Sequence, residues 1–215
     1  MMPYLAEFIT IATLHLLAVV SPGPDFAVVT RYGLHYGRRL GRWVSLGIGT
    51  GILLHVAYSL LGVAVLVHRY QWIYLTVLVI GGSYLGWLGW QAIRAQPRVA
   101  PALETTTAAV GATITPLRAF GIGFLTNGLN VKATLFFFML FSSVIAPTTP
   151  LVVKTAYGLY LAAATAIWFV TLTYLLTWPP MYRRIWRYSH WVDRAMGALL
   201  LLLSGHIFWQ FLHYF

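Results

Sequence analysis

The chain has 215 residues, of which 60% are hydrophobic and only 8% are charged. Soluble globular domains carry about a quarter charged residues, so this composition argues against a soluble fold and indicates one polytopic membrane domain. The formal net charge is +10, but the basic residues fall in short clusters between apolar runs, which argues against nucleic-acid binding. The absence of cysteine excludes disulfides, thiolate metal sites and cysteine nucleophiles.

The apolar runs predict an all-α protein with six transmembrane helices, because a helix needs about 20 apolar residues to cross a bilayer. The first run is expected to be a retained span and not a cleaved signal, since the segment before it lacks basic residues and contains Glu7. The expected spans are residues 4–30, 43–67, 71–93, 119–146, 151–177 and 193–213.

The first span is interrupted by the run Ser21-Pro22-Gly23-Pro24-Asp25. The two prolines remove backbone donors and clash with the preceding turn, so the helix is expected to kink or unwind here. Irregular backbone at membrane depth is tolerated only inside the protein or beside a wet cavity. Asp25 is costly within a span, which makes it a candidate functional residue. It can instead serve only as a cap for the half-helix that follows, and both interpretations stay open.

Lysine and arginine are distributed unevenly among the loops. The first, third and fifth loops hold 11 of the 14 basic residues, the second and fourth hold two, and Lys132 lies within a span. By the positive-inside rule, both termini then face away from the cytoplasm. The third loop, residues 94–118, is expected to be a mobile cytoplasmic linker between two three-helix repeats, residues 1–93 and 119–215. Three spans in each half give the halves opposite topologies, as in inverted-repeat transporters.

Glycine spacing gives thin support for this repeat and indicates close helix packing. Gly81 and Gly89 in the third span are echoed by Gly197 and Gly205 in the sixth, at the same spacing. Faces of small residues allow helix backbones to approach closely, and they permit a homodimer without demonstrating one. Three histidines within spans are interpreted as neutral packed side chains, with a proton relay as the open alternative. They are His15, His55 and His206.

The fourth span holds a second polar cluster, Asn127, Asn130 and Lys132. The two asparagines are three residues apart and share a helix face. They can bond neighbouring helices, and Lys132 can extend to the cytoplasmic interface, or all three can be functional. At 1.5 Å per residue, this cluster and Asp25 lie at a similar depth, roughly 8–12 Å above the cytoplasmic edge. We therefore hypothesise an Asp25–Lys132 ion pair.

Four stretches of the chain carry a family resemblance. They are the Ser21–Asp25 run, TRYGLHYGRRLGRWVSLGIGTGILLH ending at His55, GGSYLGWLGWQAIR at 81–94 and AFGIGFLTNGLNVKATLFFF at 119–138. Together they resemble the LysE/RhtB exporters, and most of all the RhtB branch of homoserine/threonine-type exporters. The resemblance implies a bacterial inner-membrane exporter of amino acids or their derivatives, with six spans and proton-driven efflux.

The resemblance also marks positions of the family motif. They are Pro22, Gly23, Pro24, Asn127, Asn130 and Lys132. The sequence departs from the family at Val131, where relatives usually have proline, so the fourth span is expected to be less broken than in relatives. The residue after Pro-Gly-Pro varies among relatives. The assignment of Asp25 to the site therefore rests on the chemistry of a buried carboxylate more than on the resemblance.

We therefore interpret the protein as a secondary transporter in which Asp25 binds a substrate ammonium and exchanges it for a proton. Lys132 would take the substrate carboxylate or hold Asp25, while Asn127 and Asn130 orient the substrate. No phosphate loop, metal motif or nucleophile motif is present, so no cofactor, metal or catalytic residue is expected. Asp25 is the only acid expected to be buried. The alternatives are a carrier of organic or metal cations, an intramembrane lipid-modifying enzyme, and a pore or structural module.

Overall fold

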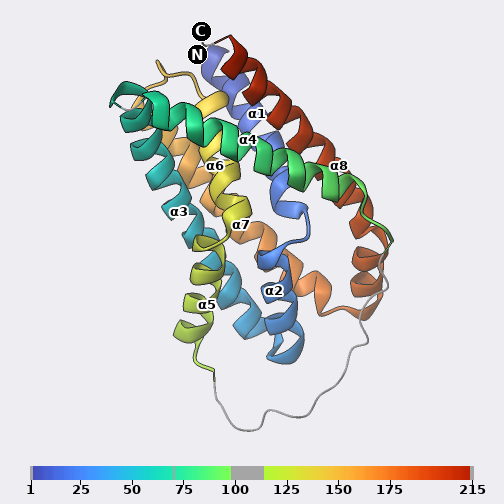
Figure 1. The fold of residues 1–215 in the computed structure, drawn as a ribbon. Coiled ribbons are helices and arrows are strands. Elements are labelled where there is room, and N and C mark those ends of the chain that lie inside the picture. The colour runs from blue at the N-terminus through green and yellow to red at the C-terminus, as the bar shows by residue number, and fades with distance from the viewer. Residues whose placement is uncertain (1, 70, 98–113, 214–215) are drawn as a thin grey trace.

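The computed structural model describes residues 2–69, 71–97 and 114–213, which form eight α-helices and no strand. The predicted all-helical class is therefore confirmed. The first half contains α1 Met2–Val20, α2 Pro24–His35, α3 Gly37–Arg69 and α4 Gln71–Ile93. The second half contains α5 Pro116–Gly128, α6 Val131–Ser143, α7 Leu151–Leu176 and α8 Pro179–Leu212. In Figure 1, the start of α1 and the end of α8 lie at one end of the bundle, and the start of α5 lies at the other.

Both expected helix breaks are present. The axes of α1 and α2 differ by 54°, and those of α5 and α6 differ by 59°. In the first break, Gly23 has extended backbone and Pro24 opens the new helix, where its missing N–H has no intrahelical partner to lose. In the second break, Asn130 caps α6 directly before Val131. The fourth span is broken although residue 131 is valine, because the asparagine cap starts a new helix without a proline. That the break is smaller than in relatives stays a prediction.

The number of membrane spans is only partly resolved by these helices. Among the residues that the structure describes, three helices are long and apolar enough to cross a membrane, and the number rises to five if each bent pair forms one span. The six-span inverted repeat therefore stays a prediction.

Helix ends differ from the expected bounds at two informative places. Helix α5 begins within the expected linker, because Thr115 caps it by accepting a hydrogen bond from the Arg118 amide at 3.2 Å. Helix α8 begins at Pro179, well before the expected residue 193, so the basic fifth loop is largely helical. Most of the expected mobile linker, residues 98–113, lies outside the described residues.

Helices α4 and α8 pack closely against each other, and Figure 1 shows them crossing. A Cβ added at Gly197 would lie 2.7 Å from the Gly89 carbonyl oxygen and 2.6 Å from the Ile93 amide nitrogen. A Cβ added at Gly89 would lie 2.8 Å from the Gly197 carbonyl oxygen. One glycine from each echoed set, Gly89 and Gly197, thus lies at this crossing, whereas Gly205 has no neighbour within 4 Å.

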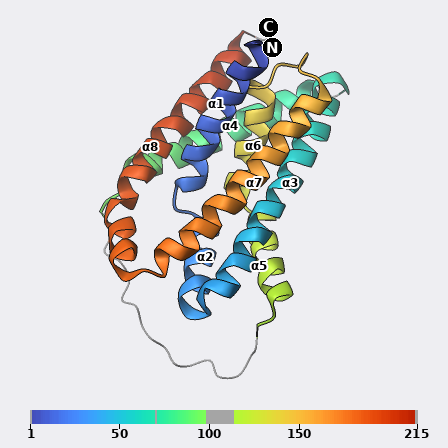
Figure 2. The same ribbon diagram turned by 180° about the vertical axis from the view of Figure 1, so that it is seen from behind.

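A second close crossing joins α3 to α5. A Cβ at Gly47 would lie 2.8 Å from the Phe124 amide nitrogen, so these two helices also touch through their backbones. The reverse view in Figure 2 shows α7 packed along α3 on the far side of the bundle. Helix α3 therefore lies at the centre of the second half's packing, against α5, α6 and α7.

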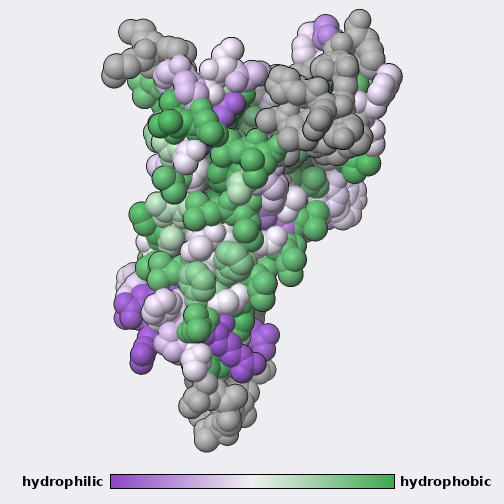
Figure 3. Space-filling model, turned by 90° about the vertical axis from the view of Figure 1, so that its left-hand side faces the viewer, coloured by the Kyte–Doolittle hydropathy of each residue, from purple (hydrophilic) through white to green (hydrophobic). Residues whose placement is uncertain are grey.

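The surface has the pattern of a multi-pass membrane protein. Figure 3 shows apolar side chains over the middle of one face, with strongly hydrophilic residues gathered toward one end. On α3 the exposed apolar side chains include Leu46, Leu53 and Leu54, which are 41%, 38% and 44% exposed. Such an apolar belt is stable in contact with lipid and unfavourable in water.

The α4–α8 crossing predicts an unequal response to the same substitution within one helix. We expect Gly197→Ala to destabilise the protein by about 1–3 kcal/mol, because the added methyl group meets backbone atoms that cannot rotate away. Gly205→Ala is the matched control on α8, where a Cβ has no neighbour within 4 Å. Thermal unfolding in detergent measures the difference. Equal melting temperatures for the two variants would show that the crossing is looser than described.

Candidate functional site

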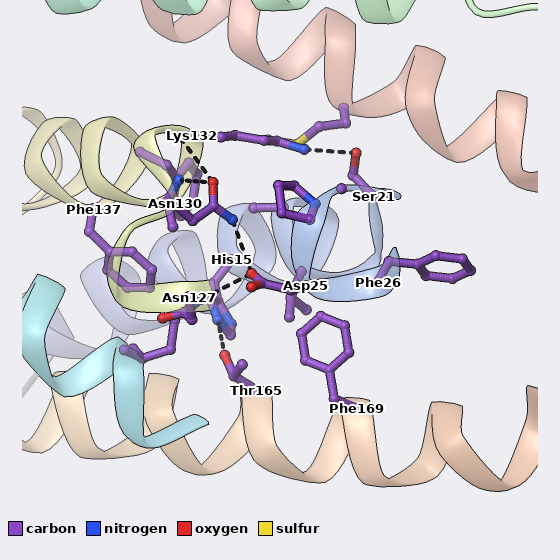
Figure 4. Close-up of a pocket in the computed structure, with 18 residues that line it drawn as sticks. His15, Ser21, Asp25, Phe26, Asn127, Asn130, Lys132, Phe137, Thr165 and Phe169 are labelled. Carbon is purple, nitrogen blue, oxygen red and sulfur yellow. Dashed lines mark hydrogen bonds between the residues drawn. The ribbon is translucent and has the colours of Figure 1, made fainter. Parts of the chain in front are cut away.

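The two helix breaks meet at the side chain of Asp25. Its Oδ2 accepts hydrogen bonds from the side-chain amides of Asn127 at 3.0 Å and Asn130 at 3.1 Å, as Figure 4 shows. Asn127 is the second-last residue of α5 and Asn130 caps α6, whereas Asp25 lies in the first turn of α2. The structure thus brings together the acid and the two asparagines that the sequence analysis selected.

Local helix geometry accounts for the orientation of these groups. The N-cap of α2 is Gly23, and no side chain caps this helix, so Asp25 is not simply a cap. Its carboxylate still benefits from the positive end of the helix dipole. The Asn130 side-chain oxygen accepts from the amides of Lys132 at 3.1 Å and Ala133 at 3.3 Å. One asparagine therefore starts α6 with its oxygen and holds Asp25 with its nitrogen.

Lys132 does not form the direct ion pair with Asp25 that we predicted. Its ammonium donates to Ser21 Oγ at 3.0 Å, and Asp25 Oδ2 accepts from the two asparagine amides instead. Ser21 in turn donates to Asp193 Oδ1 at 3.5 Å. Both carboxylates nevertheless act electrostatically on the ammonium. Lys132 therefore lies between two acids, with a serine hydroxyl next to it.

Asp193 corrects the expectation that Asp25 is the only buried acid. Asp193 is only 5% exposed. It lies inside α8, which begins at Pro179, whereas the arginines before Asp193 were expected to form a loop. A signal for its burial was present in the sequence, because Gly197 follows one turn later on the same helix face. That face packs against α4, where Arg194 also donates to the Ala95 carbonyl at 3.1 Å.

Two of the three histidines support the site. His55 Nε2 lies 2.9 Å from the Asn127 carbonyl oxygen, and because a carbonyl only accepts, this nitrogen donates the proton. The other nitrogen of His55 contacts the Tyr58 hydroxyl, and its ring stacks on Phe137 at 5.6 Å. His15 Nε2 lies 2.9 Å from the Thr165 hydroxyl. His206 is exposed, which contradicts its interpretation as a packed side chain.

Two cavities lie on either side of the breaks. The inner cavity, of about 60 Å³, is lined by His15, Asp25, Asn127 and Thr165 together with apolar residues. The vestibule, of about 520 Å³, is lined by Asp193 and by residues of α4 and α8. The wall between the two consists of residues that line both of them, which are Ser21, Gly23, Pro24, Asn130 and Lys132. Pro22 lines the vestibule.

The inner cavity has open hydrogen-bonding capacity. Asp25 Oδ1 and Asn127 Oδ1 are buried and have no hydrogen-bond partner among the described residues. Buried acceptors without partners are costly, so they mark a place where a donor is bound during function. The described part of the chain holds no group of three His, Asp or Glu side chains that could bind a metal ion. The open oxygens therefore fit a small molecule that carries N–H donors.

Comparison with known proteins assigns the chain to a family of transporters. The LysE type translocator family matches residues 16–210, which include both breaks. The threonine efflux protein of Escherichia coli strain K12 is 30% identical over 204 residues, 93% of this chain and 96% of the relative. The threonine efflux protein of Salmonella typhimurium has the same identity and coverage. The uncharacterized membrane protein YahN of Escherichia coli is 28% identical over 97% of this chain and 91% of its own.

No solved structure matches the chain. The family match nevertheless settles the choice between a transporter and an enzyme, and removes the lipid-modifying alternative. The resemblance drawn from the motif residues is confirmed, because the match covers most of the chain. The protein is a transporter that belongs to the LysE family of translocators.

Proposed function

We propose that the protein exports amino acids or their close derivatives across the bacterial inner membrane in exchange for protons. The similarity to two threonine efflux proteins supports amino-acid efflux. The observation that carries the proposal is the buried Asp25 carboxylate, which two neutral amides hold between two helix breaks while one of its oxygens stays open.

The polar groups of the site complement both ends of an amino acid. Asp25 Oδ1 is an open acceptor for the ammonium, which has three donors. The Lys132 ammonium donates to a serine hydroxyl, which is a neutral partner, so it can turn to the substrate carboxylate. The positive end of the α2 dipole lies at the same break and favours an anion there.

Neutral asparagine partners suit a carboxylate that gains and loses a proton. Asn127 and Asn130 donate to Oδ2 whether Asp25 is charged or protonated, and a proton can occupy Oδ1. The ionised carboxylate binds the substrate ammonium, and the protonated carboxylate no longer attracts it. Protonation from the outside therefore releases the substrate, and loss of the proton to the cytoplasm restores the empty site.

The membrane topology expected from the loops gives the direction of this cycle. Both termini would face away from the cytoplasm, with the basic ends of α2, α4, α5 and α8 on the cytoplasmic side. Small substrates would enter from the end of α4 and leave toward the termini. A cation carrier is less well supported, because the Lys132 ammonium lies beside the site and would repel a cation.

Uptake by inverted membrane vesicles tests the proposed function. We expect saturable uptake of at least one labelled amino acid, with threonine first in the panel, and faster uptake when the vesicle interior is acidic. The acidic interior supplies the protons that leave in exchange for substrate. Vesicles that contain the folded protein and take up no amino acid under either condition would contradict the proposal.

Replacement of Asp25 tests its role in coupling. Asp25→Asn removes the group that changes charge, so we expect uptake to fall about tenfold or more and to lose its response to the pH gradient. Glu7→Gln is the matched control, because Glu7 bonds the Ala146 amide at 2.8 Å and the Thr149 hydroxyl at 2.9 Å, away from both cavities. An Asp25→Asn protein with the wild-type rate and gradient response would remove Asp25 from the mechanism.

The two roles of Asn130 can be separated by substitution. Serine also caps helices, so Asn130→Ser should keep α6 stable but lose the hydrogen bond to Asp25, whereas Asn130→Ala should also lose about 1 kcal/mol of stability. We expect both variants to transport poorly and only the alanine variant to melt at a lower temperature. Normal uptake by Asn130→Ser would show that the amide contact with Asp25 is dispensable.

A further inference from the structure

The vestibule contains a second buried carboxylate that the proposed mechanism does not use. Asp193 lines this cavity together with Ser21 and Lys132, and its side chain is 5% exposed. Ser21 Oγ joins the other two, since it lies 3.0 Å from Lys132 Nζ and 3.5 Å from Asp193 Oδ1. A negative and a positive group therefore face one cavity with a hydroxyl between them.

This arrangement is the electrostatic complement of an α-amino acid. A buried carboxylate is costly in a membrane unless a charge or several donors offset it, so intramembrane acids are usually functional. The ammonium and carboxylate of an amino acid are attached to one carbon atom, so they are recognised by an acid and a base that lie close together. Asp193 and Lys132 have this spacing, with Ser21 as an additional donor or acceptor.

The vestibule also has the position of an entry site. It extends to Gln91 and Ala95, at the end of α4 where the exposed Gln91 side chain borders it. The residues of the two breaks separate it from the inner cavity, and Lys132 borders both. A substrate carboxylate held by Lys132 in the vestibule can therefore remain bound to the same ammonium while it passes the break.

We propose that Asp193, Lys132 and Ser21 form a second binding site for the zwitterionic substrate, in the vestibule and ahead of the Asp25 site. Asp193 accepts the substrate ammonium there, and Lys132 donates to its carboxylate. This inference rests on the proposed function, because it takes an amino acid as the ligand. Asp193 is then a substrate-binding residue of the entry site and not only a packing group of α8.

The absence of native cysteine allows a direct test of binding in the vestibule. A Gln91→Cys chain in inverted vesicles is treated with a membrane-impermeant thiol reagent, with and without threonine. We expect threonine to slow the labelling, because Gln91 lines the vestibule. Gln96→Cys is the matched control, since Gln96 is exposed nearby but lines neither cavity, and threonine should leave its labelling unchanged.

Charge at residue 193 should determine this protection. In the Gln91→Cys background, Asp193→Asn should raise the threonine concentration for half protection about tenfold, and Asp193→Glu should largely restore it. Asp193→Asn with an unchanged concentration for half protection would overturn the entry site. If that variant fails to fold, the Gln91→Cys chain with Asp193 intact still tests the entry site. In that chain, 1-aminopropan-2-ol lacks the carboxylate of threonine and 3-hydroxybutyrate lacks its ammonium. Each should protect the cysteine from labelling at least about tenfold more weakly than threonine.

Uptake measured on the same vesicles separates this inference from the proposed function. Uptake without protection of the Gln91→Cys chain would overturn the entry site and leave the exporter intact. Protection that depends on Asp193, without uptake under any gradient, would support the binding site and overturn the export proposal. The absence of both would overturn both, and equal protection by threonine and its two analogues would show that the vestibule does not recognise a zwitterion.

Discussion

The two hydrogen bonds that Asn127 and Asn130 donate to one oxygen of Asp25 join the two broken helices to each other. Their partners are more than 100 residues apart in the chain, at 102 and 105 residues of separation. An isolated carboxylate at this depth would be strongly unfavourable, and the two amides reduce that cost without adding a charge. Asn130 also starts α6, so the geometry of the break and that of the site depend on the same side chain.

The use of neutral donors has a consequence for the lysine. Had Lys132 paired directly with Asp25, the pair would have favoured the charged carboxylate at every stage, and a proton could not easily have displaced a substrate. The ammonium instead bonds a serine hydroxyl, a weaker partner that a substrate carboxylate can replace. Charged side chains thus line both cavities, and Lys132 lines both of them.

Sequence reasoning predicted the parts of the site that depend on local chemistry. Two prolines around Gly23 predict a break, and the depth of Asp25 and Asn127 predicts that the two breaks meet. The expected ion pair was wrong because depth along a helix does not say which neighbouring side chains compete for a charged group. The Lys132 ammonium donates to the Ser21 hydroxyl instead. The asparagine cap also explains why proline is not needed at residue 131.

Asp193 was missed because a cluster of arginines was interpreted as a loop. Pro179 suits the first turn of a helix, and α8 runs from there through the arginines, which places Asp193 inside a helix and not at its end. The inverted repeat is harder to predict from the sequence, because it depends on how whole helices pack. The sequences of the two halves share little beyond the glycine spacing. Such packing is set by tertiary contacts that a single sequence does not display.

The glycine crossings determine how these charged groups can move. Helices whose backbones touch have no side-chain layer to adjust between them, so α4 with α8, and α3 with α5, are each expected to shift as a pair. Asp193 belongs to the first pair, because it lies one turn before Gly197, and Asn127 belongs to the second, at the end of α5. Asp193 is therefore part of one pair, and Asp25, on α2, is hydrogen-bonded to the end of the other pair through Asn127. A movement of one pair against the other would change the distance between Asp193 and the Asp25–Asn127 contact, which line the two cavities between which a substrate would pass.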